Sequence, residues 1–432
     1  MTILIAGAGI GGLTAALSLH AVGIEAAVVE SSREIRPLGV GINLLPHAVR
    51  ELTELGLGEE LAALGVESAE MVYCDASGRR LFAEPRGTAQ GYHWPQYSVH
   101  RGELQLMLLA AVRERLGADA VRTGVRLLGF EQDDAQRGNR GGGQHGNRGG
   151  DQHGNRGGDR HGNQGALQVR LLDRASGQQE QARASALIGA DGLHSAVRAQ
   201  LHPQGGPLLW SGIRMWRGVT LAEPFLTGRS AVIVRDGDVE IIAYPIGRGR
   251  INWVCQVRTG EPGPMADDAA WSRPGALAEV LPYYRDWALD WLDVPGLLAG
   301  AEEILEYPMI DREPLPSWGH GRVTLLGDAA HPMYPVGANG ASQAIVDARV
   351  LAYELAGAAD DLPTGLTRYE SARREATAAV VRANRAMHRD GGRTPAELAR
   401  ITDTYRRTTG SDVEVLNNRP SFSRPATVTP DH

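Results

Sequence analysis

The chain has 432 residues, 42% of them hydrophobic and 22% charged, which is enough to bury the cores of two domains. Its net charge of -7 argues against a polyanionic partner, so we expect it to bind no nucleic acid. The two cysteines, Cys74 and Cys255, stand too far apart in sequence for a CxxC redox or metal motif, and we predict no metal site.

Signals for export or membrane insertion are not expected. The first apolar strand begins at Ile3 with no basic segment before it. No apolar run approaches the roughly 20 residues that a membrane helix needs. We therefore expect a cytoplasmic protein without a membrane partner, working as a monomer or a homodimer.

The beginning of the chain predicts a βαβ unit. Thr2–Ala6 and Glu25–Glu30 are short apolar strands, and Gly11–Val22 between them has apolar side chains at helical spacing. Further helices are expected at 46–64, 101–116, 277–298, 341–355 and 369–387. Further strands are expected within 72–94, at 125–134, 167–173 and 322–326, and as an antiparallel sheet through 210–257.

An eight-residue unit beginning GNRGG and ending in His repeats over residues 138–164. The repeats offer no aliphatic side chain to a core, so we expect a disordered tip on a hairpin. Two functional interpretations stay open beside that one. The recurring histidines His145, His153 and His161 could bind a metal ion, and the arginine–glycine pattern could bind RNA.

A glycine-rich turn follows the first strand and opens the first helix. Gly7, Gly9 and Gly12 have the GxGxxG spacing of a dinucleotide-binding fingerprint, in which the second glycine lets backbone amides approach a pyrophosphate. Glu30 ends the second strand, where a carboxylate can accept hydrogen bonds from a ribose diol. The same carboxylate would repel a 2′-phosphate, so NADP is excluded at this turn, while NAD and FAD both remain.

A second such turn lies in LLGDAAHPMYPVGANGAS, near the end of the chain. Asp328 follows an apolar strand, where its carboxylate can bind sugar-like hydroxyls such as those of ribitol. Gly337, Gly340 and Ala341 are small enough for a planar ring to approach the backbone. The helix that follows directs its N-terminus at that ring and favours the negative charge of a reduced flavin. NAD has neither the ribitol nor such a ring, so we predict FAD.

Three stretches, GAGIGG, GADGLHSAVR and GDAAHPMYPVGANGA, resemble the signatures of the single-component FAD-dependent aromatic monooxygenases. The resemblance implies that Asp191 and Gly192, in the middle signature, lie close to the cofactors. It also implies cofactor contacts in a flavin-flanking loop and elsewhere, at Gly41, Ile42, Arg101 and Pro335.

The resemblance further implies an α/β fold, with a Rossmann-like FAD-binding domain interleaved with a mixed-sheet substrate domain. The FAD-binding domain is expected at 1–72, 98–200 and 305–390, and the substrate domain at 73–97 and 201–304. A C-terminal helix and a loose tail are expected over 391–432.

In this family NADH or NADPH reduces the flavin, the flavin activates O2, and a hydroxyl group is transferred to an electron-rich aromatic ring. Stretches such as SVHRGELQ and YPMIDREPLPSWGHGR resemble the members that act on phenazine carboxylates, so a phenazine carboxylate or similar aromatic acid is the expected substrate. Attack at the carbon bearing the carboxylate would release CO2. Because the oxygen-activating flavin is the reagent, no catalytic acid or base is assigned. His331 is therefore not taken as a base, and Asp347 is expected to pair or to cap.

The strand-rich segment and the second turn supply candidates for the substrate pocket, since apolar and aromatic side chains can stack on a planar ring and exclude water. The candidates are Met215, Arg217, Tyr244, Trp253 and Val336. Strand alternation places Arg214 and Arg217 on opposite faces of the sheet, and one of them could attract a carboxylate.

Two other functions stay open. An FAD-dependent oxidase of a small molecule such as an amine would need no stoichiometric nicotinamide, and the repeats could give the chain an RNA-binding activity. Two further flavoprotein classes are disfavoured by missing patterns. Disulfide reductases need a second fingerprint and a cysteine pair, and flavin halogenases need a WxWxIP stretch, and neither pattern occurs.

Overall fold

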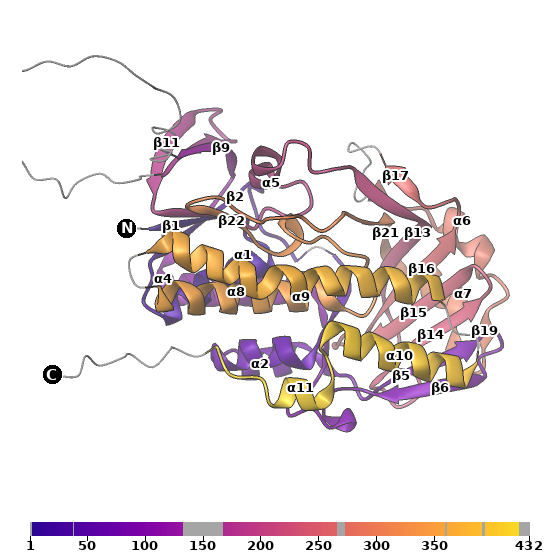
Figure 1. Cartoon of the computed structure of the whole chain (residues 1–432). Coiled ribbons are helices and arrows are strands. Elements are labelled where there is room, and N and C mark those ends of the chain that lie inside the picture. The colour runs from indigo at the N-terminus through magenta and orange to yellow at the C-terminus, as the bar shows by residue number, and fades with distance from the viewer. Residues whose placement is uncertain are drawn as a thin grey trace, which may run out of the picture.

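The computed structural model describes residues 2–37, 39–132, 167–265, 273–358, 361–390 and 394–422. The repeats at 138–164, and the metal- and RNA-binding interpretations that rest on them, lie outside the described residues. Figure 1 shows a parallel sheet with its helices at one end of the molecule, a large mixed sheet at the other, and the long helix α9 (Leu362–Asp390) extending from one toward the other. The predicted α/β class is confirmed.

The first sheet has five parallel strands in the order β22-β12-β1-β2-β8. Their bounds are Val323–Leu325, Ala186–Gly189, Ile3–Ala6, Ala26–Glu30 and Val121–Thr123 in that order. Helix α1 (Ile10–Ala21) packs against both α4 (Arg101–Leu116) and α8 (Asn339–Gly357). Because parallel strands all end at the same edge of a sheet, the turns that follow β1 and β22 stand on either side of β12.

The second large sheet is mixed, with the order β18-β21-β13-β16-β15-β14-β5-β6 and with β17 also paired to β13. Its strands, in chain order, are β5 Glu70–Asp75, β6 Arg80–Pro85, β13 Leu208–Leu221, β14 Ser230–Asp236, β15 Val239–Pro245, β16 Arg250–Arg258, β17 Gly263–Met265, β18 Arg273–Pro274 and β21 Ala301–Asp311. The expected domain boundaries at 72/73 and 304/305 fall inside β5 and β21, both of which lie wholly in this sheet. The domain division itself stays a prediction.

The two faces of the mixed sheet pack against different parts of the chain. One face carries a core rich in aromatic side chains, including Trp216, Trp253 and Tyr284, which extends to α7 (Val294–Ala299). The opposite face carries Met215, which clusters with Tyr334 of the second glycine turn. This second face is therefore the one that meets the parallel-sheet part of the molecule.

Smaller sheets and short helices join these two parts. The three-stranded sheets are β3 (Gly41–Leu44), β7 (Tyr97–His100) and β4 (Val66–Glu67), and β9 (Val125–Gln132), β10 (Leu167–Asp173) and β11 (Gln179–Ala184). A two-stranded ribbon joins β19 (Ala288–Leu289) to β20 (Leu292–Asp293). The short helix α5 (Ala196–Leu201) and 3₁₀ turns at 87–90, 118–120, 281–283 and 327–329 lie between the larger elements. In the β9–β10 hairpin Gln132 pairs with Leu167. These are the last described residue before the gap at 133–166 and the first one after it, so the two strands are paired up to both edges of that gap.

Two helices differ from the sequence predictions. The helix expected at 46–64 is divided into α2 (Pro46–Glu54) and α3 (Gly58–Leu64), because Gly56 adopts a φ of 73° between them. The helix expected at 277–298 is wrong: apart from one 3₁₀ turn, that stretch forms only the short helices α6 (Leu277–Val280) and α7, with the β19–β20 ribbon between them. Pro282 and Pro295 explain the interruption, since proline lacks the amide that a helix interior needs.

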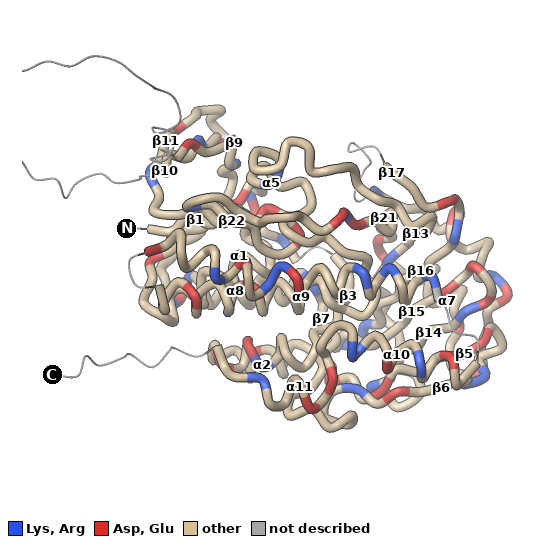
Figure 2. Tube along the Cα trace, viewed as in Figure 1, with Lys and Arg blue, Asp and Glu red and all other residues tan. Residues whose placement is uncertain are grey.

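The end of the described chain folds back over the molecule. Helix α10 (Pro395–Thr409) begins with a capping box between Thr394 and Glu397, packs along α9 and reaches β6, and α11 (Val413–Asn417) follows it. Acidic and basic residues are interspersed along α9 and α10 (Figure 2). Among the described residues, no helix is long and apolar enough to cross a membrane, and no group of three His, Cys, Asp or Glu side chains could hold a metal ion.

Gly218 provides a test of packing in the mixed sheet. A Cβ added there would lie 2.3 Å from the Trp253 ring, which is fully buried and has no room to move. We expect Gly218→Ala to lower the free energy of unfolding by about 1–3 kcal/mol, as other overpacked cores do. Gly263→Ala, at a position of the same sheet with no atom within 4 Å, is the control and should leave urea unfolding nearly unchanged.

Candidate active site

The first glycine turn is shaped by close backbone contacts. Gly7 has a φ of 105°, and a Cβ there would lie 2.3 Å from the carbonyl oxygen of Ala190. A Cβ at Gly12 would lie 2.0 Å from the carbonyl oxygen of Gly7, so glycine is needed for α1 to begin this close to β1. Gly9, the N-cap of α1, has no heavy atom within 4 Å of such a Cβ. The turn therefore leaves open space at a helix N-terminus, where a phosphate group is stabilised.

Glu30 stands beside this turn, as its position at the end of β2 predicts. Its carboxylate accepts hydrogen bonds from the backbone amides of Ala8, at 2.9 Å, and Ser32, at 2.7 Å. Gln105 of α4 donates to the carbonyl oxygen of Ala8 at 2.7 Å and holds the turn from the other side. The carboxylate is thus oriented by backbone groups, and its remaining lone pairs can accept from a ribose.

Asp328 begins the second turn directly after β22. Its side chain is exposed, although its neighbours Gly327 and Ala329 are buried. Desolvation by the surrounding protein raises the pKa of the Asp328 carboxyl, while the charges of His331 and Arg101 act in the opposite direction. Arg101, the first residue of α4, therefore lies near Asp328, and the sequence prediction that both serve one ligand is compatible with this arrangement.

The flavin-flanking loop predicted around Gly41 is held by three side chains of the mixed sheet. The amide of Gly41 donates to Asn252 Oδ1 at 2.6 Å, and its carbonyl oxygen accepts from Arg217 Nη2 and from the Tyr244 hydroxyl, both at 2.9 Å. Burial raises the pKa of Tyr244 to about 12, so the phenol stays protonated and can donate. Arg217 and Tyr244, which were predicted as pocket residues, therefore fix the position of the loop that is predicted to flank the flavin.

Four of the five pocket candidates come together on one face of the mixed sheet. Met215 and Val336 lie in one apolar cluster, and the guanidinium of Arg217 lies 5.8 Å from the ring centroid of Tyr307. Other members of the cluster are Ile213, Val254, Met309, Tyr334 and Ile242, and Ile242 also packs in the cluster of Tyr244. The face that meets the second turn is therefore apolar, with one arginine beside it.

Trp253 is not part of this face, which corrects the prediction that placed it in the pocket. Its side chain lies in the aromatic core on the opposite side of the sheet, and its indole nitrogen donates to Thr220 Oγ1 at 3.1 Å. Both faces of β16 are buried, so the sequence could not distinguish them. The arginines alternate as predicted: Arg214 pairs with Glu306 at 2.6 Å, away from the face that carries Arg217.

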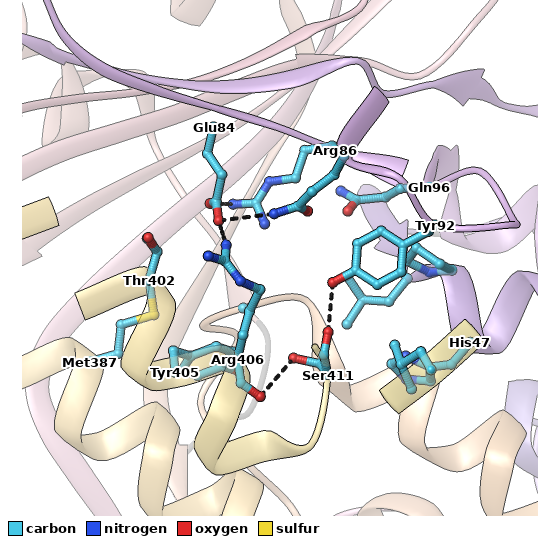
Figure 3. Close-up of a pocket in the computed structure, with 15 residues that line it drawn as sticks. His47, Glu84, Arg86, Tyr92, Gln96, Met387, Thr402, Tyr405, Arg406 and Ser411 are labelled. Atoms are coloured by element: carbon cyan, nitrogen blue, oxygen red, sulfur yellow. Dashed lines mark hydrogen bonds and ion pairs between the residues drawn. The ribbon is translucent and has the colours of Figure 1, made fainter. Parts of the chain in front are cut away.

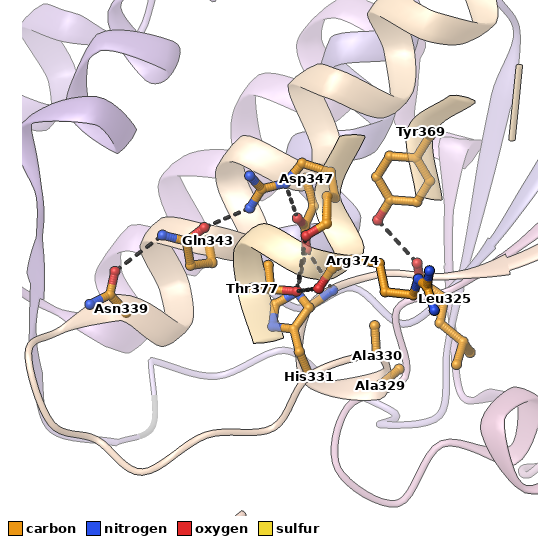
Figure 4. A network of polar contacts seen from close by, with 12 residues as sticks. Leu325, Ala329, Ala330, His331, Asn339, Gln343, Asp347, Tyr369, Arg374 and Thr377 are labelled. Atoms are coloured by element: carbon orange, nitrogen blue, oxygen red, sulfur yellow. Dashed lines mark hydrogen bonds and ion pairs between the residues drawn. The ribbon is translucent and has the colours of Figure 1, made fainter. Parts of the chain in front are cut away.

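Asp347 pairs, as predicted, and its side chain points toward His331 of the second turn (Figure 4). One carboxylate oxygen accepts from His331 Nε2 at 2.6 Å and from the Gly327 amide at 3.2 Å, and the other accepts from Arg373 Nε at 2.7 Å. Burial alone would raise the pKa of Asp347, but the charges of His331 and Arg373 outweigh it and lower the pKa. His331 is buried in this contact and holds the turn through Asp347.

The middle signature supports the same turn. Arg198 donates from one guanidinium nitrogen to the carbonyl oxygens of Ala329 and Ala330, both at 3.0 Å. Asp191 accepts from the amide of Ala196 at 2.8 Å, at the start of α5, and burial raises the pKa of its carboxyl. Arg198 is not among the residues predicted for the site, although it is the last residue of GADGLHSAVR.

These residues fit FAD. The open space at Gly9 suits a diphosphate, and Glu30 and Asp328 offer carboxylate acceptors at two separate points of the same sheet edge. The two turns are separated by one strand, β12, so a ligand that reaches both must be elongated. A dinucleotide with a ribitol chain meets that requirement.

Comparison with known proteins agrees with this arrangement. A family model for an FAD binding domain matches residues 1–148 and 296–384. The phenazine 1,6-dicarboxylic acid hydroxylase of Lysobacter antibioticus is 51% identical over 423 residues, covering 94% of this chain and 96% of that protein. The 3-hydroxybenzoate 6-hydroxylase 1 of Aquipseudomonas alcaligenes is 30% identical over 385 residues, covering 88% of this chain and 86% of its own length.

The fold is also that of solved flavoproteins. HpxO of Klebsiella pneumoniae, solved with FAD and uric acid, superposes with a TM-score of 0.70 at 24% identity, covering 97% of this chain and 95% of its own. At that identity the likeness concerns the fold alone. Taken with the family match and the two hydroxylases, it establishes that this chain belongs to the FAD-dependent single-component aromatic monooxygenases.

Proposed function

We propose that this enzyme hydroxylates a phenazine carboxylate or a closely similar aromatic acid, using FAD, NADH or NADPH, and O2. The observation that carries the proposal is the apolar face with Met215, Val336 and Arg217, set against the second glycine turn. A planar apolar ring with a carboxylate matches that surface in shape and charge. The half-identical relative that acts on a phenazine dicarboxylic acid supports the choice of ring.

Each part of the chain has a task in binding FAD under this proposal. The first turn and Glu30 would hold the diphosphate and the adenosine ribose, and Asp328 and Arg101 would hold the ribitol side. The residues that would flank the ring are Gly41, Ile42, Pro335, Gly337, Gly340 and Ala341. Bound FAD supplies the electron transfer and the activation of oxygen, and the protein binds, orients and excludes water.

Arg217 is proposed to attract the substrate's carboxylate. One of its terminal nitrogens donates to Gly41, but its Nε is buried without a hydrogen-bond partner in the described part of the chain. Burial lowers the pKa of Arg217 from its very high ordinary value, and the guanidinium remains charged at neutral pH. A buried guanidinium with a spare donor is a site for an anion.

The alternative of an FAD-dependent oxidase shares the cofactor site and differs in product, since it transfers no oxygen to its substrate. The RNA-binding alternative depends on residues outside the described ranges. The cytoplasmic location and the monomeric or homodimeric state stay predictions from the sequence. The sequence leaves open the choice between NADH and NADPH and the release of CO2.

The first test is the reaction itself. We expect the purified protein to be yellow and to oxidise NADH or NADPH in the presence of phenazine carboxylates, giving a hydroxylated product that chromatography with mass detection identifies. Incorporation of one atom of ¹⁸O from ¹⁸O2 separates hydroxylation from oxidase chemistry. Nicotinamide oxidation that yields only hydrogen peroxide across phenazine and benzoate panels would contradict the substrate class.

The second test concerns the two acids of the cofactor site. Glu30→Gln and Asp328→Asn should each weaken FAD binding about 10- to 100-fold, because each replaces a charged acceptor of hydrogen bonds by a neutral one. Titration of the apoprotein with FAD, followed by flavin fluorescence, measures the change. Glu114→Gln, at an exposed position of α4, is the matched control and should bind FAD like the wild type.

The third test separates the two arginines. Arg217→Met should raise KM for a phenazine carboxylate about 10-fold or more, and should change KM much less for the carboxamide analogue, because only the acid uses the guanidinium charge. Arg214→Met, which removes an arginine from the opposite face, should change neither value. Equal effects of Arg217→Met on the acid and the amide would mean that Arg217 serves only the Gly41 loop.

A further inference from the structure

Tyr405, on helix α10, reaches the second glycine turn from the C-terminal part of the chain. Gly337 adopts a φ of 67°, and a Cβ there would lie 2.2 Å from the Tyr405 hydroxyl oxygen. The hydroxyl therefore stands directly against the backbone of the loop that is proposed to flank the flavin. Both residues also line a cavity of about 60 Å³ between α10, β6 and the start of α2 (Figure 3).

The Tyr405 hydroxyl joins two points of this loop through amide side chains. Asn339 Nδ2 donates to it at 2.6 Å and also donates to the Gly337 carbonyl oxygen at 3.0 Å. The hydroxyl donates to Asn384 Oδ1 at 2.6 Å, and Asn384 Nδ2 donates to the Tyr334 carbonyl oxygen at 3.0 Å. One hydroxyl thus connects the backbone at Tyr334 with the backbone at Gly337.

The direction of every hydrogen bond in this network is fixed by the buried ion pair described above. Arg373 can only donate, and its Nη2 donates to Gln343 Oε1 at 2.6 Å. The amide nitrogen of Gln343 then donates to Asn339 Oδ1 at 3.1 Å, which leaves the amide nitrogen of Asn339 to face Tyr405. The Tyr405 proton is consequently directed at Asn384, and the network has no second arrangement.

Because the side chains of this network are buried, the loss of any one hydrogen bond in it costs free energy. Asn339, Gln343 and Asn384 are 2%, 8% and 0% exposed, so an amide group that loses its partner there has no water to replace it. Burial also raises the pKa of Tyr405 well above its usual range, so the hydroxyl keeps its proton. The same network ends at His331 and Asp347, which hold the beginning of the same turn.

We propose that Tyr405 is a positioning residue for hydroxylation, which fixes the loop from Tyr334 to Ala341 against the flavin through Asn339 and Asn384. The inference rests on the proposed function, since Pro335, Gly337, Gly340 and Ala341 of that loop are proposed to flank the flavin ring. A loop that shifts by a fraction of an ångström misplaces the ring relative to the substrate, and electrons from the nicotinamide are then lost to hydrogen peroxide.

The test compares Tyr405→Phe with Tyr92→Phe. Tyr92 lines the same cavity, and its hydroxyl also bonds the C-terminal segment, at the Ser411 carbonyl oxygen at 2.6 Å, but not the turn. In Tyr405→Phe we expect the hydroxylated product per nicotinamide oxidised to fall about five-fold or more, with peroxide accounting for the difference. Tyr92→Phe should keep the wild-type ratio.

A second readout does not depend on turnover. Hydrogen exchange of peptides covering 334–343, measured on the FAD-free protein and on the holoenzyme, should be faster in Tyr405→Phe than in Tyr92→Phe, while peptides of α9 remain alike. If the wild type hydroxylates no phenazine, the proposed function fails, but the exchange comparison still decides whether Tyr405 fixes the loop. Unchanged exchange and an unchanged product ratio in Tyr405→Phe would overturn the inference.

Asn339→Ala provides an independent route should Tyr405→Phe fail to fold. It cuts the same link from the side of the turn and leaves the contact between Tyr405 and Asn384 in place. We expect the same loss of product ratio and the same faster exchange, and a double variant whose losses are smaller than the sum of the two single ones, because both substitutions remove the contact between Asn339 and Tyr405. Fully additive losses, or a normal ratio in Asn339→Ala, would contradict the proposal.

Discussion

The position of the second turn depends on one buried carboxylate. Asp347 is fully buried, and a charge in that environment costs several kcal/mol unless ion pairs and hydrogen bonds compensate it. Its compensation comes from His331 and Gly327, at the two ends of the GDAAH sequence, and from Arg373 on α9. Asp328 lies between the two tethered residues and keeps an exposed carboxylate. The buried carboxylate of Asp347 thereby holds in place the segment that carries Asp328, which is proposed to bind the cofactor.

Much of the site followed from local sequence, and the rest depended on contacts between distant segments. The glycine turns were predictable because a helix that starts against a strand needs glycine at fixed spacing, and the extent of α4 agrees with the predicted 101–116. The prediction put Trp253 on the wrong face of the mixed sheet. Both faces of its strand are buried, so the alternation of side chains does not show which face packs against the second glycine turn. Asn252 gave no signal at all, since its contact with Gly41 spans 211 positions of the chain.

The site also links the cofactor loop to the proposed substrate pocket. Arg217 and Tyr244 share one acceptor, the Gly41 carbonyl oxygen, from the face of the sheet that also carries Met215. A substrate carboxylate that binds Arg217 would act on the same side chain that holds the loop. Under the proposed function, a single guanidinium would therefore couple substrate binding to the placement of this loop.

The pairing of Gln132 with Leu167 has a consequence for how this gene can vary. The chain leaves the β9–β10 hairpin and re-enters it at neighbouring points, and the hairpin supplies none of the proposed site residues. The number of eight-residue units between these two strands can accordingly change without moving any residue that is proposed for the site.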